Sequence, residues 1–420
     1  MNSIQRIAAG LLCFAAIGCS ADDNADDGPI AIVVVGPQSG PNALIGEEIG
    51  NVAKMVAEDA DNEVAGRELE LVFVDSASDP EVAVENYTAA LQDPEHNVVA
   101  GFFNWHSDVA LELMEVSADE GIAHIAALGA SEAINDKATS DPERYRGWSK
   151  GWATPTKLGA NYVTAVEDAI TAGTLDLGDR GRTVAIYGED TSWGQGFGAG
   201  MKAALEEAGW TVVAEEFVQA DGTDFTEAVD RIAAARPRLV AGTIATGSIY
   251  TFVSQVRGTF DPAEQPLIVA DGLGWNSDWF QTLGDQSDGI VDQIPQFATQ
   301  EAQDFASRYR DLYDSDPSPS AGGLAFDYGR FALKVLEQAN EDHGSINRET
   351  VLDVHANQVL TGDLDMRDGI LMSRYVWDSD SRPDPVVGVD AFTFPVLQYS
   401  AGESRVVWPE SLKTSNANIE

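Results

Sequence analysis

At 420 residues the chain is too long for one ordinary domain, and its length predicts two units that each bury a core. The formal net charge of -44, from 69 acidic and 25 basic residues, argues against nucleic-acid binding, which needs Lys and Arg to neutralise phosphates. No apolar run beyond the N-terminus reaches the ~20 residues that a membrane-spanning helix requires.

The N-terminus resembles a bacterial lipoprotein signal. Arg6 supplies a positive start, an apolar stretch follows at 7–17, and a small residue precedes Cys19. The resemblance implies that Cys19 is lipidated and becomes the mature N-terminus, with 1–19 processed as the signal; ordinary secretory cleavage at the same site is the alternative. The other cysteine, Cys13, lies inside this signal, so we expect no disulfide in the exported chain and core burial alone to stabilise it.

After an acidic tether at 20–29, strands and helices alternate. Continuous apolar runs predict strands buried on both faces of a parallel sheet, at 30–35, 69–74, 97–101 and 122–127. Helical periodicity appears between them at 43–60, 80–92 and 107–119. Charged residues and prolines interrupt this alternation at 135–156.

The alternation then resumes as a second unit with its own sheet. Its helices are expected at 157–172, 196–208, 224–235 and 248–258, and its strands at 183–187, 210–217, 238–243 and 267–270. Further helices are expected at 301–313, 321–340 and 347–358, and further strands at 370–377 and 391–399. The sequence thus predicts an α/β fold of two doubly wound parallel-sheet lobes joined by a multi-strand hinge.

The chain is expected to cross between the lobes near 152–157, 290–296 and 373–392. Accordingly, the first lobe is predicted to comprise 30–155 and 293–372, and the second lobe 156–292 and 373–410.

Ligands of open parallel sheets lie beyond the carboxyl ends of the strands, where helix N-termini also point. This rule selects loops that are rich in glycine, hydroxyl side chains and tryptophan, which suit a small ligand covered by aromatic rings. The selected loops lie at 36–40, 75–79, 102–107, 128–131, 188–193, 219–222, 245–247 and 271–275.

Several residues in these loops have two interpretations. Trp105 and Trp193 either cover a ligand or pack between helix and loop. Ser107 either contacts the ligand or caps the following helix. Asp271 follows a strand and precedes a glycine, so it either meets a ligand ammonium in the cleft or forms a turn.

Other chemistry has weak support. The segment at 194–199 reads G-x-G-x-x-A, but six residues separate it from the predicted strand, whereas the dinucleotide fingerprint needs the turn at the strand end. The five histidines show no zinc-binding spacing, and no G-x-S-x-G elbow occurs. We therefore expect no metal, no cofactor and no enzymatic activity.

From about residue 29 to 409 the chain resembles the type I periplasmic binding proteins of the branched-chain amino acid and amide group. The resemblance lies in the opening strand, S-G-P loop and helix at 30–61, in the D-x-x-x-D-P of 75–80, and in the strand and helix at 183–213. It implies two lobes that close around a small polar ligand, such as a branched-chain amino acid, an amide or a urea-like compound.

The resemblance also implies the ligand contacts. In the first lobe they are Asn104, Trp105, His106, Ser107, Leu128, Gly129, Ala130 and Ser131. In the second lobe they are Trp193, Thr246, Asp271 and Gly272. The amine half of the family's pocket, with Asp271 as its acid, is matched better than the carboxylate half, where Ser107 is the only serine in its loop.

The implied partner is an ABC permease, to which a lipid-anchored monomer in the periplasm or cell envelope delivers its ligand. The alternative is a ligand-sensing receptor of the same fold that is not coupled to a permease. Contact with the membrane is expected through the lipid anchor only, and no nucleic acid is expected as a partner.

Overall fold

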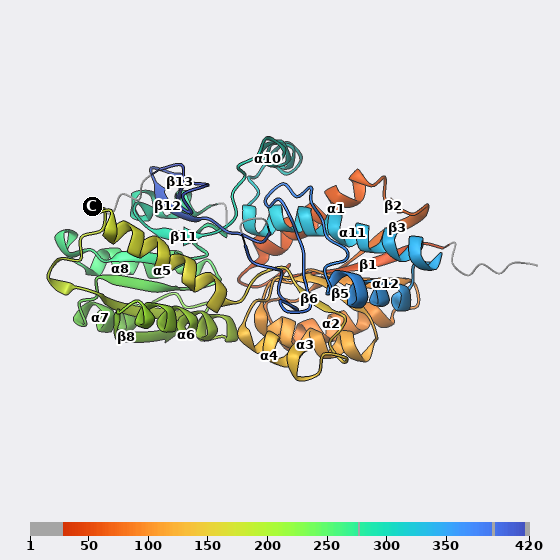
Figure 1. Cartoon of the computed structure of the whole chain (residues 1–420), viewed down its shortest axis with the longest axis horizontal. Coiled ribbons are helices and arrows are strands. Elements are labelled where there is room, and N and C mark those ends of the chain that lie inside the picture. The colour runs from red at the N-terminus through yellow and green to blue at the C-terminus, as the bar shows by residue number, and fades with distance from the viewer. Residues whose placement is uncertain (1–27, 276–277, 389–390, 416–420) are drawn as a thin grey trace, which may run out of the picture.

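The computed structural model describes residues 28–275, 278–388 and 391–415 and places them in two α/β lobes side by side (Figure 1). The predicted signal and Cys19 lie outside the described residues. Each lobe has one sheet with helices on both faces, which confirms the predicted fold class; the strands at one edge of each sheet are antiparallel. Among the described residues, no helix is long and apolar enough to cross a membrane.

The first-lobe sheet has the strand order β2-β3-β1-β4-β5-β6. Its strands are β1 (Ile30–Gly36), β2 (Glu63–Val64), β3 (Arg67–Asp75), β4 (Val98–Phe102), β5 (Ala123–Ala127) and β6 (Trp148–Lys150). Every residue of β1 is buried, and alternate side chains point into two different cores: Ile32 into one and Val33 into the other. This burial explains why β1 is apolar throughout rather than alternating.

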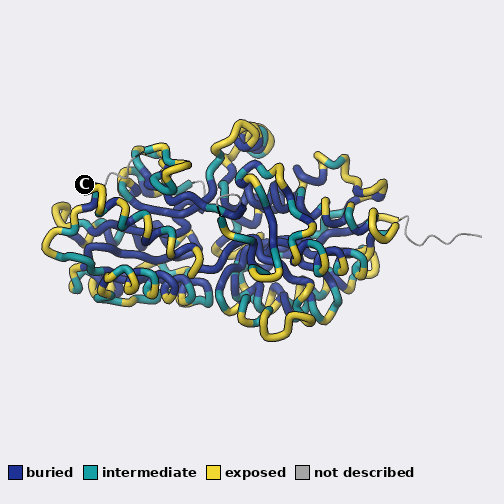
Figure 2. The backbone as a smooth tube through the Cα atoms, viewed as in Figure 1, coloured by how far each residue is buried: buried dark blue, intermediate teal, exposed yellow. Residues whose placement is uncertain are grey.

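Helices cover both faces of this sheet, and the strands stay buried beneath them (Figure 2). They are α1 (Ala43–Asp59), α2 (Pro80–Gln92), α3 (Ser107–Asp119), α4 (Glu132–Ser140), α11 (Leu324–His343) and α12 (Arg348–Val354). A further helix, α10 (Gln300–Tyr313), lies outside α1, where Tyr313 donates to the Asn51 carbonyl. Two π-helical turns, η5 (Pro319–Gly323) and η6 (His355–Val359), adjoin α11 and α12. The helices α1 and α11 contact each other, as do α2 and α3.

The second-lobe sheet has the order β13-β12-β11-β10-β9-β7-β8. Its strands are β7 (Thr183–Glu189), β8 (Thr211–Val218), β9 (Leu239–Thr243), β10 (Leu267–Asp271), β11 (Val291–Gln293), β12 (Val396–Ser400) and β13 (Glu403–Trp408). Its helices are α5 (Pro155–Thr171), α6 (Ser192–Glu207), α7 (Thr226–Ala234), α8 (Ser248–Thr259) and α9 (Trp279–Leu283). Short 3₁₀ turns are η1 (Gly178–Arg180), η2 (Pro262–Glu264), η3 (Leu273–Trp275) and η4 (Gly284–Ser287).

Three segments connect the lobes and lie together. The chain leaves the first lobe between β6 and α5, returns between β11 and α10, and enters the second lobe again before β12. The ring of Trp152 in the first connection lies 4.5 Å from that of Phe394 in the third. Gln293, at the start of the second connection, donates to the Phe394 carbonyl at 3.0 Å.

A buried carboxylate in the hinge forms ion pairs with lysines on both sides of the first connection. Asp384, which is fully buried, lies 2.7 Å from the Lys150 ammonium at the end of β6 and 2.8 Å from the Lys157 ammonium of α5. Lys150 is also fully buried. The hinge thus contains a charge cluster that both lobes share.

The strand predicted at 370–377 is wrong, because this segment forms only an isolated bridge between Met366 and Tyr375. The Asp327 carboxylate accepts the backbone N–H groups of Ile370 and Leu371, so these groups do not pair in a sheet. Within the interrupted segment at 135–156, the structure forms α4 and β6, which the charge and proline content had hidden.

The lobe boundaries that the sequence suggested remain a proposal, which the packing refines. Tyr375 donates to Asp327 of α11, and Trp377 stacks on Phe331 of the same helix with ring centroids 5.2 Å apart. Since α11 covers the first-lobe sheet, we propose that the first lobe extends beyond residue 372 and that the second lobe resumes near Phe394.

Candidate ligand-binding site

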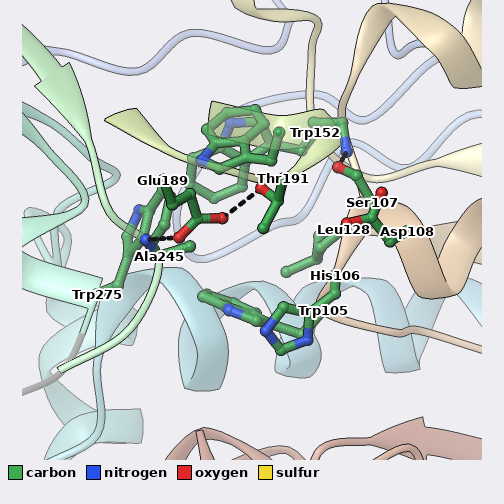
Figure 3. A pocket seen from close by; sticks show the side chains of 12 residues that line it. Trp105, His106, Ser107, Asp108, Leu128, Trp152, Glu189, Thr191, Ala245 and Trp275 are labelled. Carbon is green, nitrogen blue, oxygen red and sulfur yellow. Dashed lines mark hydrogen bonds between the residues drawn. The ribbon is translucent and has the colours of Figure 1, made fainter. Parts of the chain in front are cut away.

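A pocket lies between the lobes, where the carboxyl ends of both parallel sheets meet (Figure 3). In and around the pocket about 460 Å³ is free of protein atoms, open solvent at its mouth included. Loops after β4, β5, β7, β9 and β10 line it, together with the first hinge segment. The lining residues are Trp105, His106, Ser107, Asp108, Leu128, Ala130, Trp152, Glu189, Thr191, Trp193, Ala245 and Trp275.

The structure brings half of the predicted contact residues into this lining. They are Trp105, His106, Ser107, Leu128, Ala130 and Trp193. The other half lie outside it, namely Asn104, Gly129, Ser131, Thr246, Asp271 and Gly272.

Asn104 and Gly129 shape the first-lobe loops from behind. The Asn104 amide donates to the His106 carbonyl at 2.9 Å, and its oxygen accepts the Gly129 N–H at 3.2 Å. A Cβ at Gly129 would lie 2.7 Å from the Ala110 side chain, so only glycine fits against α3. These two residues therefore hold two pocket loops together without lining the pocket.

Ser107 joins the same loops. Its Oγ accepts the N–H groups of Ala130 and Ser131 at 3.0 and 3.1 Å, which occupies both lone pairs and leaves the hydroxyl proton to be donated. Ser107 is the first residue of α3, whose N-cap is His106, so the capping interpretation of Ser107 is wrong. Ser131 is the N-cap residue of α4 and lies outside the lining. Its N–H donates to Ser107 Oγ and so helps to join the two loops.

Four of the chain's nine tryptophans line the pocket, and Trp275 contacts the other three. Its ring centroid lies 5.5 Å from that of Trp105, 5.8 Å from Trp152 and 5.9 Å from Trp193. The indole N–H groups of Trp152 and Trp275 are buried without a hydrogen-bond partner among the described residues. The Trp193 N–H donates to Thr243 at 3.2 Å. The pocket therefore combines aromatic walls with two unused donors.

Glu189, the last residue of β7, is the buried acid of the pocket. One carboxylate oxygen accepts the Thr191 hydroxyl at 2.7 Å, and the other accepts the Ala245 N–H at 2.6 Å (Figure 3). Burial raises the pKa of Glu189, and these two hydrogen bonds oppose the shift. The second-lobe face of the pocket thus presents a carboxylate whose charge is weakly solvated.

His106 supplies a donor from the first lobe. The Asn42 amide nitrogen lies 2.7 Å from His106 Nε2 and donates to the Ala245 carbonyl of the second lobe at 3.1 Å. Since this nitrogen is a donor, Nε2 accepts and the ring proton resides on Nδ1, which is buried without a partner among the described residues. Burial lowers the pKa of His106 to about 4, so the ring is neutral at pH 7.

Asp271 does not face the pocket, which corrects the sequence-based placement. It is fully buried behind the lining and accepts the Tyr162 hydroxyl at 2.6 Å. Burial and the nearby charge of Asp292 raise the pKa of Asp271 well above its usual range. The chain turns at Gly272, where φ is +88°, and it is Trp275 that reaches the pocket. The N–H of Gly272 bonds to Asp292 at 2.9 Å, so Gly272 also acts from outside.

Thr246 likewise lies outside the lining. Its hydroxyl donates to the Ala220 carbonyl, and Ser248 shares this contact. Thr246 therefore joins two second-lobe loops, and the neighbouring Ala245 lines the pocket instead.

The lining residues that sequence reasoning did not single out are Asp108, Trp152, Glu189, Thr191, Ala245 and Trp275. All except Asp108 and Trp152 lie in loops that the strand-end rule had selected. Glu189 lies in the selected loop at 188–193, and Trp152 at the predicted crossing near 152–157. The available signal was the loop, because no local pattern distinguishes the side chain that points inward.

The glycine-rich segment at 194–199 lies inside α6, not at a strand end. A Cβ at Gly194 would lie 2.1 Å from the Glu189 carbonyl oxygen, so this glycine allows α6 to approach β7. Within the described ranges, no group of three or more His, Cys, Asp or Glu side chains is arranged to hold a metal ion.

A family model described as a periplasmic binding protein matches residues 29–370, which is most of the chain. The chain belongs to the periplasmic binding protein family. This is a family of solute-binding proteins rather than enzymes, and membership implies an extracytoplasmic location. The resemblance seen in the sequence is thereby confirmed at the level of the family.

This periplasmic binding protein is 23% identical over 304 residues to the leucine-, isoleucine-, valine-, threonine- and alanine-binding protein of Pseudomonas aeruginosa, covering 72% of this chain and 76% of that one. A structure of a putative branched-chain amino acid ABC transporter from Silicibacter pomeroyi superposes with a TM-score of 0.73 and 17% sequence identity. The match covers 93% of this chain and 99% of that one. A solute-binding protein of an ABC transporter from Rhodopseudomonas palustris, in complex with 3,4-dihydroxybenzoic acid, superposes with a TM-score of 0.72 and 15% sequence identity. The match covers 90% of this chain and 95% of that one. These structures share the fold.

Proposed function

We propose that the protein captures a small polar metabolite of amino acid or amide type between its lobes and delivers it to an ABC permease. The observation that carries the proposal is the pocket itself, whose walls come from both lobes and the hinge. A ligand there contacts both lobes at once, so binding favours the closed arrangement.

The contacts across the cleft support a closed form of this kind. The Asn42 amide of the first lobe bonds to the Ala245 carbonyl of the second, and α3 and α4 contact α6. The Pseudomonas relative is named for the amino acids that it binds, which favours an amino acid ligand. The Silicibacter protein is named as an ABC transporter, which favours transport over sensing, although both roles begin with ligand capture.

Ligand capture is tested by thermal unfolding of the purified protein with amino acids, amides, ureas and polyamines. A ligand at about 100 times its Kd adds about 2.7 kcal/mol to the stability of the folded state and raises the melting temperature. Ala245→Phe, which fills the pocket, should abolish the shift, whereas Ala203→Phe on the exposed side of α6 should keep it. No shift with any compound would contradict the proposal.

We further propose that Cys19, which lies outside the described residues, carries the lipid anchor. Cells supplied with labelled palmitate should incorporate the label into the protein, and Cys19→Ala should prevent incorporation and release the protein from the membrane fraction. Uptake of labelled ligand by cells with and without the gene separates transport from sensing, because only a transport receptor changes uptake.

A further inference from the structure

The charges around the pocket are of one sign. Among the described residues that line it, Glu189 and Asp108 are acids, and none is a lysine or an arginine. Glu189 is only 2% exposed and lies beside no cation in the lining. A buried carboxylate without a positive partner favours a ligand that brings the cation itself.

Three hydrogen-bond donors of the pocket are unused among the described residues. The Ser107 oxygen already accepts two N–H groups, and each Glu189 oxygen already accepts one bond. His106 Nδ1 and the indole nitrogens of Trp152 and Trp275 are unused donors. A primary ammonium needs an acceptor for each of three N–H bonds, and each Glu189 oxygen has one acceptor position left. A cation without N–H groups makes no such demand.

The walls suit a cation of dispersed charge. Four indole rings line the pocket, each less than 9% exposed, and indole is the side chain that binds cations best through its face. Figure 3 shows Glu189 on one side of the pocket and His106 and Ser107 on the other. Glu189 and the donors are therefore separated across the space that a ligand fills, and Asp108 lies next to Ser107 on the donor side.

We propose that the pocket selects a compact methylated-ammonium zwitterion, of which trimethylglycine is the simplest. Its quaternary nitrogen lies among the indole rings beside Glu189, and its carboxylate accepts from His106 and Ser107 of the first lobe. This inference rests on the proposed function and names the ligand class of the same pocket.

The test is calorimetric titration of the purified protein at pH 7 with three probes. Trimethylglycine is compared with 3,3-dimethylbutyrate, which has the same shape and carboxylate but no positive charge, and with leucine, which has a primary ammonium. We expect trimethylglycine to bind at least roughly tenfold more tightly than either comparison compound. Equal or tighter binding of 3,3-dimethylbutyrate or leucine would overturn the inference.

Two variants locate the cation. Glu189→Gln keeps an acceptor for the Ala245 N–H but removes the charge, and it should weaken trimethylglycine by roughly tenfold while leaving 3,3-dimethylbutyrate unchanged. Trp105→Leu removes a ring but keeps apolar bulk. It should weaken binding of trimethylglycine more than binding of 3,3-dimethylbutyrate, and it tests the assignment even if Glu189→Gln does not fold. Equal losses for both probes in the folded variant would refute the assignment.

The outcomes separate this inference from the proposed function. Binding of leucine or an amide without binding of trimethylglycine would overturn the ligand class and leave solute capture intact. Absence of binding by every compound in the wider panel would contradict solute capture itself.

Discussion

The two lobes contribute different chemistry to one pocket. The first-lobe face supplies donors, from the His106 ring and the Ser107 hydroxyl, on loops that Asn104 fastens together. The second-lobe face supplies the buried acid Glu189 and the indoles of Trp193 and Trp275. A ligand with two unlike ends is therefore satisfied only when both faces reach it, which makes closure a condition of affinity.

The two faces also differ in how they are supported. The first-lobe loops are held by short side-chain to backbone bonds between neighbouring loops. The second-lobe turn that carries Trp275 is held by Asp292, which accepts the N–H groups of Gly272 and Gly274 and the hydroxyl of Tyr399. Support by buried carboxyl groups predicts that the second face responds to pH.

The largest expected effect comes from breaking the hinge that both faces share. Asp384→Ala leaves the fully buried Lys150 without its carboxylate, and removal of one partner of a buried ion pair costs about 3–5 kcal/mol. We expect a marked fall in the guanidinium unfolding midpoint. Glu403→Ala, which breaks the exposed pair with Arg405, is the control and should change stability by about 1 kcal/mol or less. Similar midpoints for both variants would contradict the importance of the hinge cluster.

A smaller loss of stability is expected when Ser107, which joins the first-lobe loops by hydrogen bonds, is replaced. Ser107→Ala leaves the N–H groups of Ala130 and Ser131 without their acceptor, at a cost of about 1–3 kcal/mol, and should also weaken ligand binding. Thr246→Val removes a second-lobe hydroxyl that lies outside the lining and should leave affinity unchanged. Thermal unfolding measures the stability of both variants, and titration measures their affinity for the ligand. Equal affinities in the two variants would contradict the role of Ser107 in the pocket.

The second face should respond to pH through Asp271. Because burial raises the folded pKa of Asp271 above the value of about 3.9 in unfolded chains, its stabilising contribution is complete below pH ~4 and is lost as the pH rises toward the folded pKa. Asp271→Asn has no proton to release. The melting temperature of this variant should therefore gain on the natural protein between pH 4 and pH 7, and a constant difference would show that folding does not raise the pKa of Asp271.

The smallest effect concerns the bond between the faces. Asn42→Ala removes the hydrogen bonds to the Ala245 carbonyl and to His106 Nε2. The bond to Ala245, at about 0.5–1.5 kcal/mol, corresponds by itself to a loss of affinity of roughly twofold to tenfold. Asn51 lies in α1, the helix that Asn42 precedes, and it bonds to Tyr309 within the first lobe, so Asn51→Ala should bind normally. Faster ligand release in stopped-flow tryptophan fluorescence should accompany the Asn42 change alone.

Much of the fold was predictable because its signals are local. The run at 30–35 is apolar throughout because both faces of β1 are buried, and the Asp79-Pro80 pair begins α2 with its carboxylate capping two N–H groups. The segment at 370–377 misled because its apolar side chains pack on α11 while its N–H groups bond to Asp327, a residue 43 positions away from Ile370. Local pattern does not reveal such a partner.

The candidate site divides in the same way. The sequence by itself indicated most of the loops that meet at the pocket, because parallel strands bring their carboxyl ends to one edge of each sheet. Five of the eight selected loops contribute to the lining, and the loops at 36–40, 75–79 and 219–222 lie outside it. Only the tertiary structure decided which side chain of each loop faces inward. Asp271 faces away because it accepts the buried hydroxyl of Tyr162, 109 residues earlier, and Glu189 and Trp275 take the inward positions. Burial and non-local partners set these directions, and both arise only when the two lobes have folded.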